Sequence, residues 1–207
     1  MQITIKPDES VTIFGRKGSG KTSFLNWMID SSIVRGTHRK IILDTKQVGD
    51  FSRFPAVQEL KDLHKLVAST PVCVYAPHSG EAHDQNFIET FFAWAYERWN
   101  TCIVVDELTS IVWGNDVPDS YKDITDRGRA KHVVLWQSNQ KPVYVPHAAI
   151  SEADHYAVFD LQYDKDRDKV AGIVGSKMLK ARPPDPHGFF YYYKSMRNPI
   201  YCPGLNL

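Results

Sequence analysis

Eight residues near the start of the sequence, Gly15-Arg16-Lys17-Gly18-Ser19-Gly20-Lys21-Thr22, fit the pattern G-x-x-x-x-G-K-[ST] at every specified position. Glycines let the backbone curl so that successive N–H groups point into one concavity, and a following helix adds its positive N-terminal end. In this pattern the lysine reaches the β- and γ-phosphates of a nucleotide, and the threonine hydroxyl binds Mg²⁺. We therefore expect an ATP and Mg²⁺ site contacted by Gly15, Arg16, Lys17, Gly18, Ser19, Gly20, Lys21, Thr22 and Ser23.

A Mg²⁺–nucleotide complex also needs a carboxylate, usually at the end of a neighbouring strand. Two apolar runs end in aspartate: one at Asp44, the other at the adjacent pair Asp106-Glu107. The second run is the better candidate, because its two carboxylates supply a metal partner and a base. We expect Asp106 to help hold Mg²⁺ and Glu107 to orient and deprotonate the attacking water.

The pair also bears on the type of reaction. A base next to the metal is what hydrolysis needs, whereas a kinase must exclude water and position another acceptor. The sequence therefore favours an ATPase over a nucleotide or small-molecule kinase. A protein that binds ATP only to order an assembly is a further alternative, which Glu107 also disfavours.

Short β-rich runs alternate with longer helical ones, which favours an α/β fold with a mostly parallel sheet flanked by helices. Some runs, such as Ile41-Ile42-Leu43, are apolar without alternation, as expected when both faces of a strand are buried. The predicted strands are 11–14, 40–44, 72–76, 101–105, 132–137 and 156–161. The predicted helices are 21–34, 55–68, 84–99 and 120–130.

The texture changes after Leu161. A charged stretch at 164–169 predicts a turn or helix, the proline-containing stretch 182–188 a stiff connector, and the aromatic run 189–193 a last strand, although such a run could instead stack bases. We expect a single domain over 1–207, with a core of about 1–161 and a basic C-terminal segment of about 162–207.

The 25 Lys+Arg and 24 Asp+Glu give a net charge of +1, which argues against a protein that coats nucleic acid over its whole surface. The charge is uneven, because 161–207 carries 8 basic and 4 acidic residues. Three widely spaced cysteines predict neither a disulfide framework nor a metal motif. No run is long and apolar enough to span a membrane or to act as a signal peptide, so we expect a soluble, intracellular protein.

These motifs together resemble the FtsK/HerA superfamily of DNA-translocating P-loop ATPases, with a RecA-like sheet. Within it they resemble the genome-packaging ATPases of tailless icosahedral viruses with double-stranded DNA and an internal membrane. The resemblance runs from the phosphate loop to about Leu161. Besides Gly15 to Thr22, it is carried by Asp44-Thr45-Lys46, by Val105-Asp106-Glu107, by the basic stretch Arg127 to His132 with the strand that leads to Gln140-Lys141-Pro142, and by the stretch Ser151 to Phe159.

The resemblance implies a homo-oligomeric ring, expected to be a hexamer, with ATP bound between subunits. A neighbouring subunit would supply an arginine for the developing charge, with Arg127 and Arg129 as the candidates. A polar sensor is expected on the following strand. Gln137 is favoured over Gln140 because it lies nearer the predicted strand end; Lys141 departs from the arginine usual in the family.

The resemblance also implies sequence-independent contact with double-stranded DNA through its phosphates. Candidate contacts are the loop 46–53 and the tail residues Lys177, Lys180 and Arg182. Because the phosphate loop begins at residue 15, we expect a bare motor core like the viral enzymes, working with capsid or portal-vertex proteins in the host cytoplasm or at the packaging vertex of the virion. A cellular or plasmid-borne HerA-like translocase is the nearest alternative.

Overall fold

The computed structural model describes residues 3–6, 8–33 and 38–204. Within these residues, nine strands form one sheet in the order β3-β4-β2-β5-β6-β1-β7-β8-β9. The strands are β1 Val11–Phe14, β2 Arg39–Leu43, β3 Ala56–Val57, β4 Val72–Tyr75, β5 Thr101–Val105, β6 Val133–Asn139, β7 His155–Val158, β8 Phe189–Tyr193 and β9 Ile200–Cys202. All neighbouring pairs from β3 to β7 are parallel, and only β8 and β9 are added antiparallel. The expected mostly parallel sheet is confirmed.

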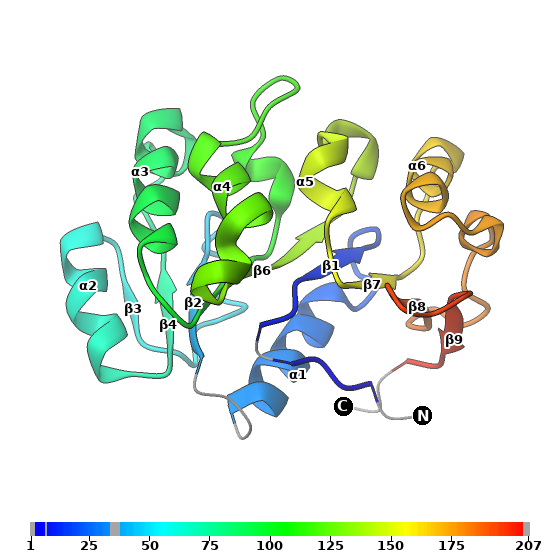
Figure 1. Cartoon of the computed structure of the whole chain (residues 1–207), viewed down its shortest axis with the longest axis horizontal. Coiled ribbons are helices and arrows are strands. Elements are labelled where there is room, and N and C mark those ends of the chain that lie inside the picture. The colour runs from blue at the N-terminus through cyan, green and yellow to red at the C-terminus, as the bar shows by residue number, and fades with distance from the viewer. Residues whose placement is uncertain (1–2, 7, 34–37, 205–207) are drawn as a thin grey trace.

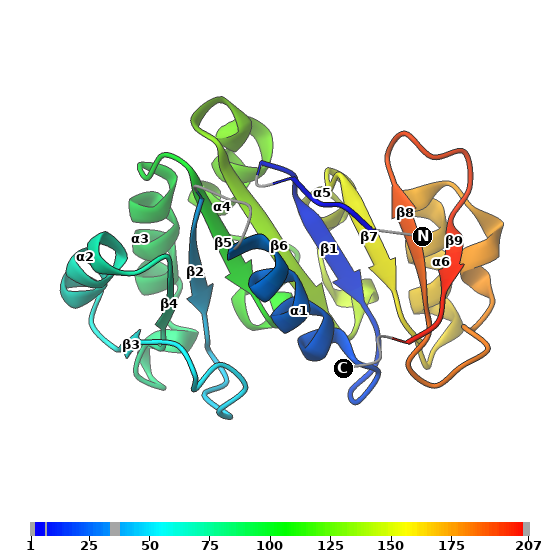
Figure 2. The same ribbon diagram turned by 90° about the horizontal axis from the view of Figure 1, so that it is seen from below.

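The helices cover the two faces of the sheet unequally. Helix α1 lies on one face, and α2 to α6 lie on the other (Figures 1 and 2). The helices are α1 Lys21–Ile33, α2 Leu60–Ser69, α3 Gln85–Tyr96, α4 Asp119–Arg127, α5 His147–Ser151 and α6 Asp164–Val174. Short 3₁₀ turns are η1 Glu81–His83, η2 Leu108–Ile111, η3 Gly128–Lys131, η4 Pro142–Tyr144 and η5 Lys177–Lys180.

The central strands are buried on both sides, as their unbroken apolar runs predict. Ile41 packs in the core under α2 to α6, and the next residue, Ile42, packs in the core under α1. The same alternation holds for Ile103 and Val104 in β5. A sheet covered by helices on both faces gives every side chain of these strands an apolar neighbourhood.

The parallel strands bring the predicted chemistry to one edge of the sheet. Strands β2, β5, β6 and β1 are consecutive neighbours that all run in one direction. Their carboxyl ends therefore share an edge, which holds Asp44 after β2, Asp106 and Glu107 after β5, Asn139 at the end of β6, and the phosphate loop after β1. Ligands of open α/β sheets bind at this edge.

The helix predicted over 55–68 is wrong in its first residues. Residues Ala56–Val57 form β3 beside β4, and α2 begins only at Leu60. The backbone carbonyl of Pro55 accepts a hydrogen bond from Val74 N, 2.8 Å away, and that of Val57 accepts one from Ala76 N at 2.9 Å. Residues Ala56–Val57 thus become a strand because β4, which comes later in the chain, offers them an edge to pair with.

Two other helix ends differ from prediction for local reasons. Helix α3 begins after Asp84, whose carboxylate accepts hydrogen bonds from Asn86 N and Phe87 N as an N-cap. Helix α4 ends at Arg127 rather than 130, because Gly128 approaches β6 so closely that a Cβ there would lie 2.3 Å from the Val133 carbonyl oxygen. The chain continues as η3 and reaches β6 through His132 at φ 53°. The predicted end of the first helix, Val34, lies outside the described residues.

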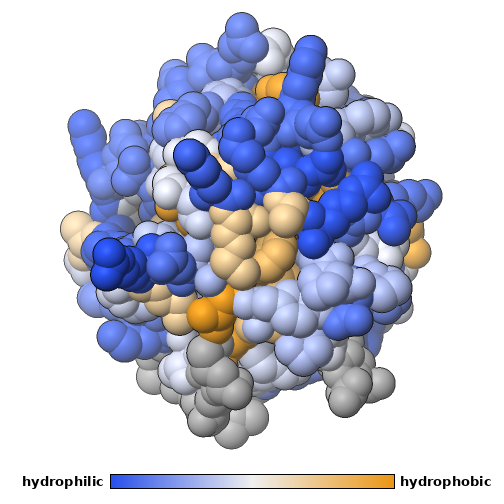
Figure 3. All heavy atoms as spheres, turned by 90° about the vertical axis from the view of Figure 1, so that its right-hand side faces the viewer, coloured by the Kyte–Doolittle hydropathy of each residue, from blue (hydrophilic) through white to orange (hydrophobic). Residues whose placement is uncertain are grey.

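The C-terminal segment extends the same sheet. The predicted last strand is confirmed as β8, and its residues Phe189, Phe190 and Tyr191 are buried, so they are not free to stack bases. Strand β9 was not predicted. The side of the molecule on which β8 and β9 lie is mainly hydrophilic, with a small apolar area near its centre (Figure 3). Among the described helices, none combines the length and hydrophobicity of a membrane span.

Candidate active site

The phosphate loop connects β1 to α1 in a tight curl. Gly18 and Gly20 take φ values of 76° and 107°, which side-chain-bearing residues rarely adopt. A Cβ at Gly15 would lie 2.5 Å from Ser19 Oγ. No described residue accepts a hydrogen bond from the N–H of Lys17, Gly18 or Gly20, and the buried Ser19 hydroxyl also has no partner among the described residues. These donors fit an anion held in the loop.

Lys21 is only 6% exposed, and its ammonium donates to the Arg16 carbonyl oxygen across the loop, at 3.1 Å. Burial lowers the pKa of Lys21 to about 8, although the charges of Glu107 and Asp106 counteract this. A buried ammonium with one carbonyl partner can gain further acceptors. It is placed to bind phosphate oxygens.

Thr22 and Asp106 meet at the start of α1. The Thr22 hydroxyl donates to Asp106 Oδ1 across 3.2 Å, and Ser138 Oγ donates to the Asp106 carbonyl oxygen. Burial raises the pKa of Asp106 above its ordinary value, and the neighbouring Lys46 offsets part of this. A hydroxyl and a carboxylate facing the same space are hard oxygen donors, which fit a Mg²⁺ ion that takes its other ligands from phosphate and water.

Lys46 is a site residue that the sequence reasoning assigned elsewhere. Its Nζ lies 3.0 Å from Asp106 Oδ2 and 3.5 Å from Glu107 Oε2. Burial lowers its pKa, but the two carboxylates outweigh burial and raise the pKa above its ordinary value. Asp44 Oδ1 accepts hydrogen bonds from Lys46 N and Gln47 N, at 3.1 and 2.8 Å, and so fixes the turn that carries Lys46.

The signal for Lys46 was its position in Asp44-Thr45-Lys46, one of the motifs of the family resemblance. The prediction that included it among DNA-contacting loop residues does not fit its ion pairs inside the site. Arg53, at the end of the same loop, contacts Asp30 and Asn26 on α1.

Glu107 lies beside this cluster and is 9% exposed. Thr109 Oγ1 donates to its Oε1 at 2.6 Å, and Gln140 N lies within 3.4 Å of the same oxygen. The other oxygen, Oε2, faces Lys46. The structure thus brings together the predicted Lys21, Thr22, Asp106 and Glu107.

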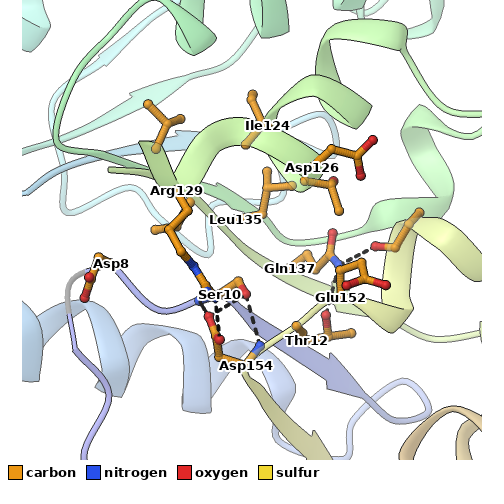
Figure 4. A pocket seen from close by; sticks show the side chains of 15 residues that line it. Asp8, Ser10, Thr12, Ile124, Asp126, Arg129, Leu135, Gln137, Glu152 and Asp154 are labelled. Atoms are coloured by element: carbon orange, nitrogen blue, oxygen red, sulfur yellow. Dashed lines mark hydrogen bonds and ion pairs between the residues drawn. The ribbon is translucent and has the colours of Figure 1, made fainter. Parts of the chain in front are cut away.

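Gln137 does not lie in this cluster, and its prediction as sensor is corrected. Its side-chain amide nitrogen donates to Thr12 Oγ1 at 2.9 Å and to the Ala149 carbonyl oxygen at 2.8 Å, and Tyr121 donates to its oxygen. All this occurs in the core beneath α4 and α5, beside a second cavity of about 220 Å³ (Figure 4). The amide is fully used in packing the sheet against these helices.

Asn139 is one of the residues that the sequence did not predict for the site. Strand β6 runs two residues past the predicted end, so its last residue is Asn139, and the Asn139 carbonyl accepts a hydrogen bond from Gly15 N at 3.1 Å. Its side-chain oxygen accepts one from Lys141 N at 2.6 Å, while its buried Nδ2 has no partner among the described residues. The sequence carried no local signal for this residue, because the strand was predicted to end at Gln137.

Arg127 and Arg129 lie far from the phosphate loop of their own chain, because η3 leads into the start of β6, at the opposite edge of the sheet. Arg127 is 75% exposed, and its nearest carboxylate, Asp123, is 3.8 Å away. Arg129 points toward the buried Asp154 and lies 2.7 Å from it (Figure 4). The structure does not place either arginine in the site of its own chain.

A cavity of about 350 Å³ opens beside the phosphate loop. It is lined by the loop, by the first residues of α1 including Ser23, and by Phe159 and His187. Phe159 follows β7, and His187 belongs to the predicted proline-containing connector. Neither was predicted as a site residue.

The chain is similar in fold to several solved structures, among them two virus packaging NTPases. No family model and no curated protein sequence matches it. The DNA-packaging ATPase B204 from Sulfolobus turreted icosahedral virus superposes with a TM-score of 0.80 at 17% identity, covering 98% of this chain and 100% of that one. The genome-packaging NTPase B204 from Sulfolobus turreted icosahedral virus 2, in complex with ATP-γS, gives 0.80 at 17% identity, covering 97% and 100%.

VirB4 of Thermoanaerobacter pseudethanolicus gives a TM-score of 0.72 at 10% identity, covering 99% of this chain and 94% of that one. At these identities the likeness concerns the fold. The chain therefore shares the α/β fold of these proteins over nearly its whole length, as the resemblance seen in the sequence implies for the fold.

Proposed function

We propose that this protein is a Mg²⁺-dependent ATPase that translocates double-stranded DNA and packages a viral genome into a preformed capsid. The observation that carries the ATPase part is the convergence of Lys21, Thr22, Asp106 and Glu107 at one edge of the sheet. The fold of two virus packaging NTPases, matched from end to end, supports the packaging role.

Each residue of the site has a role in hydrolysis. The phosphate loop and Lys21 would hold the phosphates, and Thr22 and Asp106 would hold Mg²⁺, whose charge would stabilise the negative charge of the phosphates. Glu107 orients water and accepts its proton. Lys46 faces both carboxylates with its ammonium and opposes the rise that burial causes in the pKa of Asp106.

Asn139 completes the site from β6. Its unpartnered Nδ2 lies at the end of the strand whose backbone holds the first residue of the phosphate loop. A buried donor without an acceptor costs stability, so such groups are retained where a ligand supplies the acceptor. We assign it to the γ-phosphate or the attacking water, the role that Gln137 cannot fill.

The arginine for the transition state comes from a neighbouring subunit in this proposal. Arg127 and Arg129 are on the surface, at the edge opposite the phosphate loop, so head-to-tail packing in a ring brings them toward the next site. Arg127 is the freer of the two. The proposed assembly is a homo-hexameric ring that encloses double-stranded DNA and holds it without regard to its sequence. The ring is proposed to bind capsid or portal-vertex proteins.

Steady-state ATP hydrolysis, with and without double-stranded DNA, tests this function. The matched variant is Glu107→Gln, which keeps the shape and removes the base. Turnover that needs Mg²⁺ and Glu107 and rises with DNA supports the proposal. Turnover that requires a small phosphate acceptor instead of water would identify a kinase. ATP hydrolysis at the same rate with and without DNA would contradict the proposed translocation.

A further inference from the structure

The cavity beside the phosphate loop continues past the phosphate-binding residues to His187. Strand β8 is antiparallel to β7, so it begins at the edge of the sheet where β7 and β1 end. The connector 182–188 before β8 is therefore brought to the same edge as the phosphate loop. Figure 2 shows the connector and the loop along one edge of the molecule.

The connector is fixed at its beginning by Arg182. Its Nη2 donates to the Gln162 carbonyl oxygen at 3.0 Å, and its Nε lies 3.5 Å from Asp160 Oδ1. The same carboxylate accepts a hydrogen bond from Arg16 Nε at 2.6 Å, and the Asp160 carbonyl accepts one from Arg16 N at 2.7 Å. Asp160 thus joins the connector to the phosphate loop itself.

The other end of the connector is fixed by β9 and the residues after it. Tyr201 donates a hydrogen bond to Asp185, and Gly188 packs so closely on Tyr201 that a Cβ there would lie 2.5 Å from its hydroxyl oxygen. Gly204 approaches His187 in the same way, with a Cβ position 3.0 Å from His187 Cβ. His187 is thereby held in place although its side chain is exposed.

The chemistry of this part of the cavity suits a planar aromatic group. Phe159 is buried against Phe24 and Phe189. The edge of its ring faces Gly20, and a Cβ placed on Gly20 would lie 3.3 Å from Phe159 Cε1. His187 Nδ1 lies 3.9 Å from the same position. Beyond the phosphate-binding residues, the described residues that line the cavity therefore present two rings and no carboxylate.

We propose that the imidazole of His187 is the surface on which the nucleoside of the bound nucleotide packs, with its base stacked on the ring. This rests on the proposed nucleotide site. Phosphates held by the loop leave the nucleoside in the remaining space of the same cavity, where His187 and Phe159 are the aromatic groups. Base stacking on an aromatic side chain is sequence-tolerant, so it adds affinity for the nucleoside part and does not select among bases.

The test compares two ligands that share the phosphates and differ in the nucleoside. Dissociation constants for β,γ-methylene-ATP and for inorganic tripolyphosphate are measured by calorimetry on the full chain. The variants are His187→Ala, His187→Phe and, as a matched control, His147→Ala, which removes an exposed histidine on α5. Binding of tripolyphosphate also reports that the loop of each variant is intact.

The expected result is that His187→Ala raises the dissociation constant for β,γ-methylene-ATP about fivefold or more. Tripolyphosphate binding stays within about twofold, and His187→Phe and His147→Ala bind both ligands like the parent. Equal weakening of both ligands would overturn the proposal, because His187 would then contact phosphate. So would unchanged binding of both. A parent protein that binds neither ligand would instead overturn the nucleotide site itself.

Discussion

Lys46 Nζ lies 3.0 Å from Asp106 Oδ2 and bridges the end of β2 to the end of β5. The pair is partly buried, and Lys46 faces the second carboxylate, Glu107, at 3.5 Å. With Lys21 nearby, two cations and the two carboxylates of Asp106 and Glu107 form one cluster at the edge of the sheet where the nucleotide is proposed to bind. The four charges balance in the absence of ligand, which allows them to be buried together.

The first prediction concerns Lys46→Met. Burial raises the pKa of Asp106 and Lys46 opposes this, so removing the ammonium raises the pKa further. Because Asp106 must be ionised to bind Mg²⁺, the acid limb of the pH–rate profile of ATP hydrolysis moves to higher pH. Lys65→Met, which removes an exposed lysine of α2, leaves the limb in place; an unmoved limb in Lys46→Met would contradict the role given to Lys46.

A second prediction follows from Lys21, whose pKa burial lowers to about 8. Bound phosphates favour the charged ammonium, so nucleotide binding raises the pKa of Lys21. At a pH above about 8, where Lys21 of the free protein is uncharged, binding therefore takes up a proton. The dissociation constant for β,γ-methylene-ATP therefore rises as pH increases through 8, by up to about tenfold per unit. Calorimetry at several pH values measures it. The dependence disappears in Lys21→Met, and a constant affinity between pH 7 and 9.5 would refute the shift.

Asn139 and Gln137, two residues apart on β6, are predicted to behave oppositely. Asn139→Ala removes the free Nδ2 donor, so kcat falls about tenfold to a hundredfold while nucleotide affinity and melting temperature change little. Rapid-quench and calorimetric measurements separate these quantities. A normal kcat would exclude Asn139 from the reaction.

Gln137→Leu, in contrast, removes the three buried hydrogen bonds that Gln137 makes with Tyr121, Thr12 and Ala149. Tyr121 and Ala149 keep the bond to each other, so Thr12 is the residue whose side chain loses its partner among the described residues. We expect a loss of about 2 kcal/mol in the free energy of unfolding, measured by urea denaturation, with near-normal kcat per folded molecule. A fall in kcat at unchanged stability would restore Gln137 as the sensor.

Substitutions of Arg129 in η3 and Arg127 in α4 are predicted to have different effects, the first on stability and the second on catalysis. Arg129→Ala removes one of the two cations on the buried Asp154, leaving Lys194. Since two thirds of Arg129 is in water, we expect a loss of about 1 kcal/mol in unfolding free energy. Arg127→Ala is expected to leave stability unchanged and to reduce kcat about a hundredfold or more, as loss of an arginine finger does.

Mixing experiments show whether Arg127 acts between subunits. Arg127→Ala and Lys21→Ala proteins are each expected to have little activity on their own. If the arginine serves the neighbouring site, mixed assemblies regain part of the activity, because some interfaces then hold both an intact phosphate loop and an intact arginine. Absence of any recovery, with mixed assembly verified by mass spectrometry, would show that Arg127 does not act on the site of a neighbouring subunit.

The sequence was most informative where local pattern and global fold agree. Strands 11–14 and 101–105 were predicted to the residue, and in the parallel sheet they bring Lys21, Thr22, Asp106 and Glu107 to one edge, on either side of β6. Failures came from contacts distant in sequence. Strand β3 forms only because β4 offers a free edge, and the two extra residues of β6, which moved the strand end from Gln137 to Asn139, have no signature in their own composition.

The cavity residues illustrate the same limit. His187 looked like part of a connector, because nothing near it in sequence indicates a site. It reaches the phosphate loop only through the antiparallel return of β8 and the bonds of Arg182 and Tyr201. Such a position depends on the register of the whole sheet, which no window of sequence contains.

The central claim is that ATP hydrolysis moves this protein along duplex DNA. A duplex that carries a short third strand reports such movement directly, since a translocating protein displaces that strand. We predict displacement that requires ATP and Mg²⁺ and is abolished in Glu107→Gln, although this variant still binds nucleotide. Hydrolysis of ATP by the parent protein on this DNA, with no displacement of the third strand, would contradict the account.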